Sequence, residues 1–306
     1  MKKFKKTLVY EFEGSTALKD IATEFSDEVI HKTAPDDYKD LLKPEDFVNV
    51  ECFLTDVFDN FKNDLFDLDS LKYVGANFSD LAMFDVDFLQ SKGVEVKNIK
   101  GQATEPVVQF MLSVLLNVSR KTTESLKFAK DGGHGFSDFK GTELGSHTVG
   151  VYGLGSIGKR FAEIMQYFGS EIKHTSQTEK DGFTKVSLDQ LANNSDVLVV
   201  TVPLTEKIKA SITTDVLAKL NKNAVILCPT RLDVINVPDL ISYLKDNQKS
   251  TFWMDGNHGD AWNEYHEELL KLDNILVTPG NGFFTEENRP RALELTKNNL
   301  INYLNG

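Results

Sequence analysis

Short apolar runs alternate with amphipathic stretches along most of the chain. In the N-terminal third the runs typical of strands are KTLVYEF, DFVNVECF, LKYVGAN and GVEVKNI, with helical stretches around 17–25 and 85–92. A second series predicts strands near 148–152, 171–175, 196–202, 223–228, 250–255 and 274–278. Strands that alternate with helices predict an α/β fold, in which helices cover parallel sheets.

Three further segments complete this pattern. In TEPVVQFMLSVLLNVSRK the apolar residues go almost all the way round a helix at 104–120, which predicts burial on most faces, between domains or between subunits. The glycine-rich and polar stretch at 130–146 is typical of a loop. An amphipathic final helix is expected at about 286–304.

Length and composition limit the possible function classes. A chain of 306 residues with 41% apolar content is expected to form two domains, and no apolar run reaches the length of a membrane span. The basic start is followed by only TLVY, too short for a signal peptide, so we expect a cytoplasmic protein. The net charge of −12 argues against nucleic acid and anionic membranes as partners, and two distant cysteines predict neither a disulfide nor a metal site.

The stretch HTVGVYGLGSIGKRFAEIMQYFG carries the clearest chemical signal. Gly153, Gly155 and Gly158 form a G-x-G-x-x-G pattern between a buried strand and a helix. The first glycine allows a tight turn, the second lets the backbone approach a diphosphate, and the third lets the helix pack closely on the strand. The helix N-terminus favours negative charge. We therefore predict a dinucleotide site whose turn also contains Leu154, Ser156 and Ile157.

The residues after the next strand bear on the choice between NAD and NADP. Ser176 lies close to the spacing of about 20 residues at which NAD-binding folds carry an acidic residue for the ribose. Its neighbours Thr175 and Gln177 are also neutral, which removes repulsion of a 2′-phosphate. Lys173, His174 or Lys180 would supply positive charge. NADP is therefore favoured as the cofactor, and NAD with a weakened ribose contact is the alternative.

These motifs resemble the D-isomer-specific 2-hydroxyacid dehydrogenases over nearly the whole chain. LKYVGANFSDLAMFDVDFLQSKGVEVKNI, TVGVYGLGSIGKRFA, SDVLVVTVPLTEKIKASITTDVLAKLNKNAVILCPTR and DNILVTPGNGFFTEE carry the similarity. The resemblance implies two Rossmann-like domains with doubly wound parallel sheets. A discontinuous substrate domain would take 1–100 and 286–306, and a dinucleotide-binding domain 101–285. It also implies a homodimer, a small 2-oxo or 2-hydroxy acid as substrate, and a nicotinamide cofactor.

The resemblance assigns roles residue by residue. Arg231, just past NAVILC, takes the place of the arginine that binds the substrate carboxylate, and its guanidinium is permanently charged. Asp255 falls where the family contacts the nicotinamide amide. Val202, Pro203 and Thr230 match positions near the nicotinamide ribose. Ser79 and Asp80 fall in the carboxylate-binding loop, where the family usually has glycine, and Asp80 brings negative charge towards an anionic substrate.

Both positions of the acid–base pair depart from the family. The catalytic histidine is replaced by Gly280, and the glutamate that pairs with it is replaced by Asp260, five residues after Asp255. Asp260 is the remaining candidate for proton transfer, and His258, two residues before it, is a second. Two functions stay open: a 2-oxo-acid reductase with altered proton transfer, and a weak or inactive homologue that binds a dinucleotide as a sensor or structural ligand.

Overall fold

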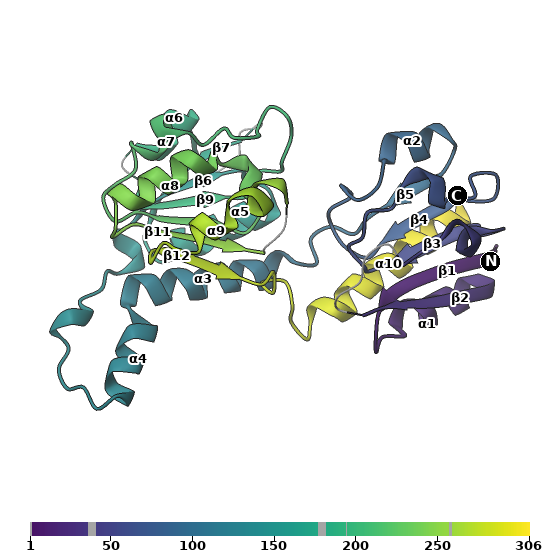
Figure 1. Cartoon of the computed structure of the whole chain (residues 1–306), viewed down its shortest axis with the longest axis horizontal. Helices are drawn as coiled ribbons and strands as arrows, with labels where there is room; N and C mark the ends of the chain where they lie inside the picture. Colours follow the sequence, from purple (N-terminus) through teal and green to yellow (C-terminus); the bar gives the residue numbers. More distant parts are fainter. Residues whose placement is uncertain (1, 36–40, 177–181, 194, 257–258) are drawn as a thin grey trace. The chain divides into compact units, whose positions relative to one another are not determined.

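The computed structural model describes residues 2–35, 41–176, 182–193, 195–256 and 259–306. The chain divides into two compact units, Met1–Ala103 with Thr285–Gly306 and Thr104–Phe284 (Figure 1). Both units carry parallel strands covered by helices, so the predicted α/β class is confirmed. The function of each unit remains a prediction at this stage.

The first unit is built around a parallel sheet. Among the described residues this sheet has five strands in the order β2-β1-β3-β4-β5. The strands are β1 (Phe4–Phe12), β2 (Ser26–Ala34), β3 (Cys52–Thr55), β4 (Tyr73–Ala76) and β5 (Glu95–Lys97). The helices are α1 (Ala17–Phe25), α2 (Val86–Ser91) and α10 (Asn288–Asn305), with 3₁₀ turns η1 (Pro44–Phe47) and η2 (Asn63–Leu65).

Each face of this sheet has its own core. Side chains of successive strand residues point to opposite faces. Val9 and Leu54 therefore pack with Leu18 of α1 and Leu300 of α10, whereas the other face packs a phenylalanine-rich cluster against α2 and the 3₁₀ turns. Helix α10 thus returns the end of the chain to the sheet formed by its beginning (Figure 1).

The strand prediction is wrong at two places in this unit. The run DFVNVECF was expected to be a strand, but its first part is the 3₁₀ turn η1 and strand β3 begins only at Cys52. Asn49, with φ +59°, interrupts extended backbone between them. Strand β2 is not among the predicted strands because it is a sheet edge whose residues 27–33 are partly or fully exposed and mostly polar.

The second unit holds the larger sheet. Its described residues form seven parallel strands in the order β12-β11-β10-β9-β6-β7-β8. The strands are β6 (Thr148–Tyr152), β7 (Glu171–Thr175), β8 (Thr184–Lys185), β9 (Val197–Val200), β10 (Val225–Cys228), β11 (Thr251–Asp255) and β12 (Ile275–Thr278). The helices are α3 (Thr104–Arg120), α4 (Thr122–Lys130), α5 (Ser156–Tyr167), α6 (Leu188–Ala192), α7 (Thr214–Leu217), α8 (Val237–Asp246) and α9 (Asp260–Leu269). Three 3₁₀ turns are η3 (Ser137–Phe139), η4 (Leu144–Ser146) and η5 (Leu232–Val234).

Helices lie on both faces of this sheet, as in a doubly wound fold. Helices α6, α7, α8 and α9 pack with Leu198, Ile226 and Phe252 on one face. On the other, Phe110 of α3 lies against Trp253 with ring centroids 5.8 Å apart. Only part of α3 is buried within the chain, and Leu116 is 41% exposed. The predicted burial of this helix on most faces is therefore not reached within one chain.

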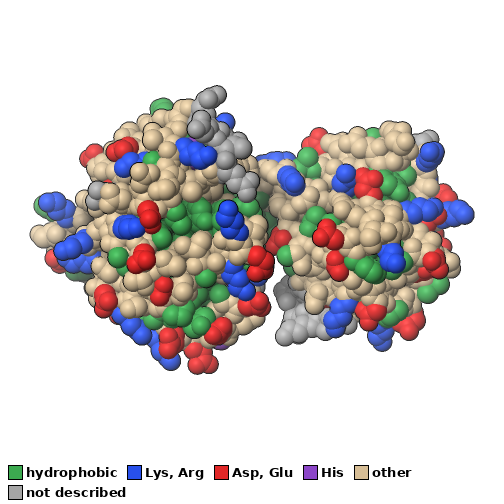
Figure 2. Space-filling view, turned by 90° about the horizontal axis from the view of Figure 1, so that it is seen from above, with side chains coloured by type: hydrophobic (Ala, Val, Ile, Leu, Met, Phe, Trp, Pro, Cys, Tyr) green, Lys and Arg blue, Asp and Glu red, His purple; other side chains and the backbone are tan. Residues whose placement is uncertain are grey.

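The surface carries both signs of charge. On the face shown in Figure 2, lysine and arginine side chains are interspersed with aspartate and glutamate. Within the described residues, no helix combines the length and the apolar content that a membrane crossing requires. The cytoplasmic location itself stays a prediction.

Candidate functional site

The strand order places the predicted cofactor residues along one edge of the second sheet. Because all strands are parallel, their carboxyl ends meet at the same edge. Strands β12, β11, β10, β9, β6 and β7 are consecutive neighbours there. Asp255 is the last residue of β11, and the segments that follow β12, β10, β9, β6 and β7 contain Gly280, Thr230, Val202, Gly153 and Ser176, respectively. Residues far apart in sequence are thus brought to one edge, where doubly wound sheets bind ligands.

Gly153 forms a turn that no other residue adopts without strain. Its φ is +99°, and a Cβ would lie 2.4 Å from the backbone nitrogen of Val202. The amide of Gly153 donates to the carbonyl of Thr175 at 2.9 Å. The hydroxyl of Thr201 donates to the carbonyl of Gly153 at 2.6 Å. The turn is therefore held from both neighbouring strands.

Gly155 and Gly158 differ in what surrounds them. At Gly158 a Cβ would lie 2.2 Å from the carbonyl oxygen of Gly153, so this glycine lets α5 pack on the turn. At Gly155 a Cβ would have no atom of the described residues within 4 Å. Gly155 is also the N-cap of α5, and no side chain caps that end. Backbone N–H groups at a helix N-terminus beside open space suit a diphosphate.

The end of β7 carries no carboxylate. Ser176 hydrogen-bonds the buried ring of His174 through Nδ1 at 3.2 Å. His174 is fully buried, so the prediction that it supplies surface charge for a 2′-phosphate is wrong. The Nζ atom of Lys173 lies 3.4 Å from Oε1 of Glu171 on the same strand. Gln177 and Lys180 lie outside the described residues.

The strands beside the glycine turn supply the next predicted residues. Thr230 donates its hydroxyl to the carbonyl of Val200 at 3.1 Å, which ties the end of β10 to β9. Val202 is half-buried against the glycine turn, and Pro203 is exposed. Burial raises the pKa of the Cys228 thiol to about 11, so this sulfur is a packing group, not a nucleophile.

Arg231 lies just beyond β10 and is paired with a residue that sequence reasoning missed. Its Nε is 3.4 Å from Oδ2 of Asp233, and the two side chains are 29% and 3% exposed. The other carboxylate oxygen of Asp233 accepts the Ala261 N–H at 3.3 Å. Gly259 packs on this pair, because a Cβ there would lie 3.0 Å from Asp233 Oδ2. Nothing in the sequence pattern marks Asp233, since these contacts are tertiary.

Asp255 has a structural task that the sequence did not predict. Its Oδ1 accepts the Thr278 hydroxyl at 2.6 Å and the Gly280 N–H at 3.1 Å. Its Oδ2 accepts the Gly282 N–H at 2.8 Å. A Cβ on Gly282 would lie 2.7 Å from that same oxygen. Three of about four acceptor positions on the carboxylate therefore hold the turn at 278–282.

Gly280, where the histidine was expected, lies in this turn with φ +80°. Among the atoms of the described residues, a Cβ there would meet only the Cα of Gly256, at 3.5 Å, so these residues leave space for a side chain although the backbone is left-handed. Asp260 is exposed in the first turn of α9, and no side chain among the described residues pairs with its carboxylate. His258 lies outside the described residues.

The predicted substrate loop follows β4 in the first unit. Gln102 donates to the Ser79 hydroxyl at 3.0 Å, and Asn98 donates to the Ser79 carbonyl at 2.5 Å. The carboxylate of Asp80 accepts the Ala82 N–H at 2.9 Å. Ser79 and Asp80 are both exposed. Asp80 therefore stabilises the conformation of its own loop.

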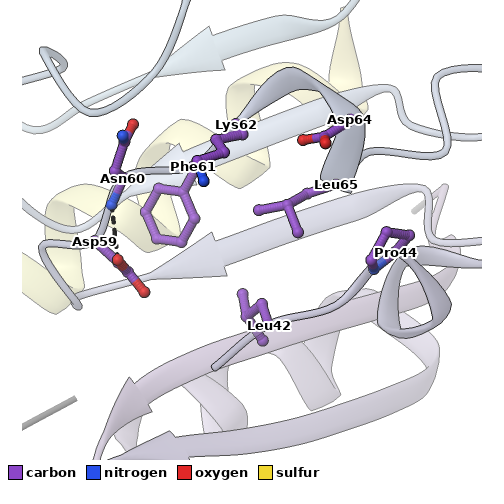
Figure 3. Close-up of a pocket in the computed structure, with 8 residues that line it drawn as sticks. All are labelled: Leu42, Pro44, Asp59, Asn60, Phe61, Lys62, Asp64 and Leu65. Carbon is purple, nitrogen blue, oxygen red and sulfur yellow. Dashed lines mark hydrogen bonds between the residues drawn. The ribbon is translucent and has the colours of Figure 1, made fainter. Parts of the chain in front are cut away.

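The first unit also contains a buried carboxyl group and a cavity. Burial raises the pKa of Asp56 to about 6, with a further contribution from nearby Glu11 and opposition from the Phe12 N–H and Arg289. A cavity of about 240 Å³ lies near η1 and η2 (Figure 3). None of the predicted site residues lines it; the lining residues are Leu42, Pro44, Asp59, Asn60, Phe61, Lys62, Asp64 and Leu65.

Comparison with known proteins gives a consistent result. A family model described as D-isomer specific 2-hydroxyacid dehydrogenase, NAD binding domain, matches residues 112–282. The hydroxyphenylpyruvate reductase of Plectranthus scutellarioides is 30% identical over 243 residues, covering 78% of this chain and 77% of that protein.

Two solved structures have the same fold. The D-lactate dehydrogenase of Aquifex aeolicus, complexed with NAD and lactic acid, matches with TM-score 0.81 and 20% identity over 98% of this chain and 96% of that one. The NADPH-dependent glyoxylate/hydroxypyruvate reductase of Sinorhizobium meliloti, in complex with NADP and malonate, matches with TM-score 0.81 and 21% identity over 98% and 94%.

Proposed function

The chain belongs to the D-isomer-specific 2-hydroxyacid dehydrogenase family, and on this premise we propose that it reduces a small 2-oxo acid to the 2-hydroxy acid. The observation that carries the proposal is the glycine turn, in which Gly153 and Gly158 are closely packed whereas Gly155 faces open space. The second unit would hold the dinucleotide, and the first unit would contribute the substrate loop with Ser79 and Asp80. When bound, a nicotinamide dinucleotide supplies the hydride.

The residues of this chain bind and orient the substrate. The Arg231 guanidinium would bind the substrate carboxylate and stabilise negative charge on the C2 oxygen. Val202, Pro203 and Thr230 would line the nicotinamide ribose, as their place beside the glycine turn supports. One acceptor position on Asp255 is left for the nicotinamide amide, after three hydrogen bonds to the turn.

Proton transfer would differ from the family pattern. Gly280 has no side chain to carry a proton, so we assign the role to Asp260, acting directly or through water. A single carboxylate without an imidazole partner would then replace the acid–base pair of the family. General acid–base catalysis contributes roughly 10²–10⁴-fold, so we expect slow turnover.

The alternative function, a dinucleotide-binding homologue with little or no turnover, rests on the same glycine. One experiment separates the two. Purified protein is incubated with NADPH or NADH and a panel of glyoxylate, pyruvate, hydroxypyruvate and phenylpyruvate, and cofactor oxidation is followed by absorbance. Turnover on any acid supports the reductase. No oxidation above background, together with thermal stabilisation by the cofactor, supports the binding protein and overturns the reductase.

Restoring the missing acid tests the proton-transfer assignment. We expect Gly280→His combined with Asp260→Glu to raise kcat, because the space at Gly280 admits a side chain. The left-handed backbone makes the change cost about 1–2 kcal/mol of stability, although histidine is tolerated there better than most residues. Asn281→His is the matched control, since it adds the same imidazole one residue away. A folded, cofactor-binding double variant with unchanged kcat contradicts the assignment.

We propose NADP as the preferred cofactor because the end of β7 offers the neutral Ser176 and no carboxylate. Without a carboxylate there is no charge repulsion of a 2′-phosphate. Calorimetric titration of the protein with NADPH and with NADH measures the preference. A lower Kd for NADPH supports the proposal. A lower Kd for NADH means that Ser176 and its surroundings retain a ribose contact instead.

We also propose that the protein is a homodimer through α3 and α4. Helix α4 and the loop after it extend away from the sheet of the second unit (Figure 1). Leu126 is 66% exposed, Phe136 86% and Leu116 41%, so apolar side chains are left for a partner. Leu126→Glu is expected to give monomers by light scattering, whereas Lys130→Glu on the same helix keeps the dimer. A monomeric wild-type protein contradicts the proposal.

A further inference from the structure

Asp233 is the buried carboxylate nearest to the proposed substrate-binding arginine. It lies in η5, two residues after Arg231, and its side chain is 3% exposed. The two oxygens have different partners. Oδ2 faces Nε of Arg231 at 3.4 Å, and Oδ1 accepts the N–H of Ala261 at 3.3 Å. Its backbone carbonyl accepts the N–H of Ala210 at 2.8 Å, which fixes the turn that carries it.

The carboxylate of Asp233 contacts the Arg231 guanidinium at its Nε edge. A guanidinium has five N–H donors in a fixed plane, and Asp233 takes only the Nε edge. Within the described part of the chain the two Nη groups have no other partner, and they are the groups that a ligand would use. Gly259 completes the arrangement on one side, because a Cβ there would lie 3.1 Å from Nη2 of Arg231. A side chain at position 259 would displace the guanidinium from this orientation.

The same carboxylate reaches the helix that carries the proposed acid. Ala261 follows Asp260 in the first turn of α9, where N–H groups favour negative charge. A buried carboxylate is costly unless it is paired and hydrogen-bonded, and Asp233 satisfies both conditions only in this arrangement. Moving Arg231 or α9 would leave the charge partly unsatisfied. Asp233 thus couples the position of the arginine to the start of α9.

We propose that Asp233 is the positioning residue for Arg231, orienting its Nη groups towards the substrate and holding the first turn of α9 beside them. This inference rests on the proposed function of Arg231. Asp233 does not touch the substrate in this role. Its effect is on the orientation of the guanidinium in the transition state, where small displacements lower the rate.

Asp233→Asn is the most informative substitution. The amide has nearly the same shape and keeps an oxygen for the Ala261 N–H, but it loses the charge that orients Arg231. It also removes a negative charge from beside an anionic substrate, which favours binding. We therefore expect kcat to fall about tenfold, equivalent to about 1.4 kcal/mol, while KM does not rise. The Kd of NADPH should not change.

A double-mutant cycle separates positioning from a general structural effect. Arg231→Lys, Asp233→Asn and the double variant are compared by kcat and by melting temperature. If Asp233 acts through Arg231, the double variant loses no more kcat than Arg231→Lys alone. Asp239→Asn is the matched control, because Asp239 accepts the Thr214 N–H at 2.8 Å and, like Asp233, holds a helix terminus. This control should leave kcat unchanged.

The outcomes distinguish this inference from the proposed function. In an active enzyme, two outcomes overturn the positioning role of Asp233: the losses of kcat in the two single variants multiply in the double variant, or the loss of kcat follows the fall in melting temperature. Neither outcome contradicts the reductase activity. If the wild-type protein oxidises neither cofactor with any 2-oxo acid, the reductase itself fails. The same cycle is then measured on the Kd of oxamate with NADPH present, where additive effects overturn the positioning role and non-additive effects support it.

Discussion

Gly155 and Gly158 lie three residues apart, yet the same added methyl group is expected to have different consequences at each. In Gly158→Ala the new Cβ would lie 2.2 Å from the Gly153 carbonyl oxygen and 2.6 Å from the Thr201 hydroxyl. Neither contact is tolerated, so α5 must move away from the turn. Overpacking of this kind costs about 1–3 kcal/mol, and the better helix propensity of alanine returns at most about 1 kcal/mol.

At Gly155 the packing cost disappears and the cofactor is affected instead. A Cβ there has no heavy atom within 4 Å in the part of the chain that the structure describes. The backbone, with φ −76° and ψ −163°, is extended and suits alanine. Alanine at an N-cap costs less than about 1 kcal/mol relative to glycine. The methyl group would, however, occupy the space proposed for the diphosphate. Contact with the helix N–H groups would lengthen, and we expect the Kd of NADPH to rise at least about tenfold.

Two measurements separate these effects. Melting temperature without cofactor should fall by roughly 3–8 °C for Gly158→Ala and change by less than about 2 °C for Gly155→Ala. The Kd of NADPH, from titration of its fluorescence, should rise for Gly155→Ala. Gln166→Ala, at an exposed position of the same helix, controls for helix propensity. A Gly155→Ala protein that binds NADPH as tightly as the wild type would refute the assignment of this turn to the diphosphate.

Two further predictions concern other parts of the molecule. Gly282→Ala brings a Cβ to 2.7 Å from Asp255 Oδ2, so the turn at 278–282 must shift; we expect kcat/KM to fall more than about tenfold, and unchanged kinetics would contradict a role for this turn in the site. The folded chain raises the pKa of Asp56 to about 6, above the value of about 4 in an unfolded chain, so its contribution to stability is complete below pH 4 and is lost as pH rises to about 6. Relative to wild type, Asp56→Asn should therefore gain up to about 2–3 kcal/mol of unfolding free energy between pH 4 and pH 7 in denaturant titrations. A difference that does not change with pH would rule out the elevated pKa of Asp56.

The parts of the fold that the sequence predicts correctly depend on local physics. Strands β6, β9 and β10 are apolar runs because helices cover both faces of the sheet, so the pattern alone identifies them. The glycine turn is predictable because backbone geometry requires Gly153 and close packing requires Gly158, whereas Gly155 keeps side-chain atoms away from the helix N-terminus. Strand β2 escapes prediction for the opposite reason: it is an edge strand with a polar sequence, and only pairing with β1 makes it a strand.

Side-chain contacts between distant segments could not be predicted in this way. Asp233 reaches Ala261 and Asp255 reaches Gly282 only after the sheet has aligned the ends of β10, β11 and β12. The flanking residues predict that Gly280 takes the place of the family's histidine, and this remains a prediction. The sequence did not show that the Gly280 N–H is held by Asp255 in a left-handed conformation.

The hydrogen bond from the Gly280 N–H to Asp255 suggests a structural reason for glycine at this position. A histidine simply deleted from an otherwise unchanged turn would leave a backbone suited to any residue. Here φ is +80°, which favours glycine, and the neighbouring Gly282 must also lack a side chain so that Asp255 can approach. The turn at 278–282 is therefore built around the carboxylate of Asp255. The proposed proton transfer therefore uses a group outside that turn. Among the described residues, Asp260 is the proposed group because it is exposed at the start of α9 and linked through Ala261 to the Asp233–Arg231 pair.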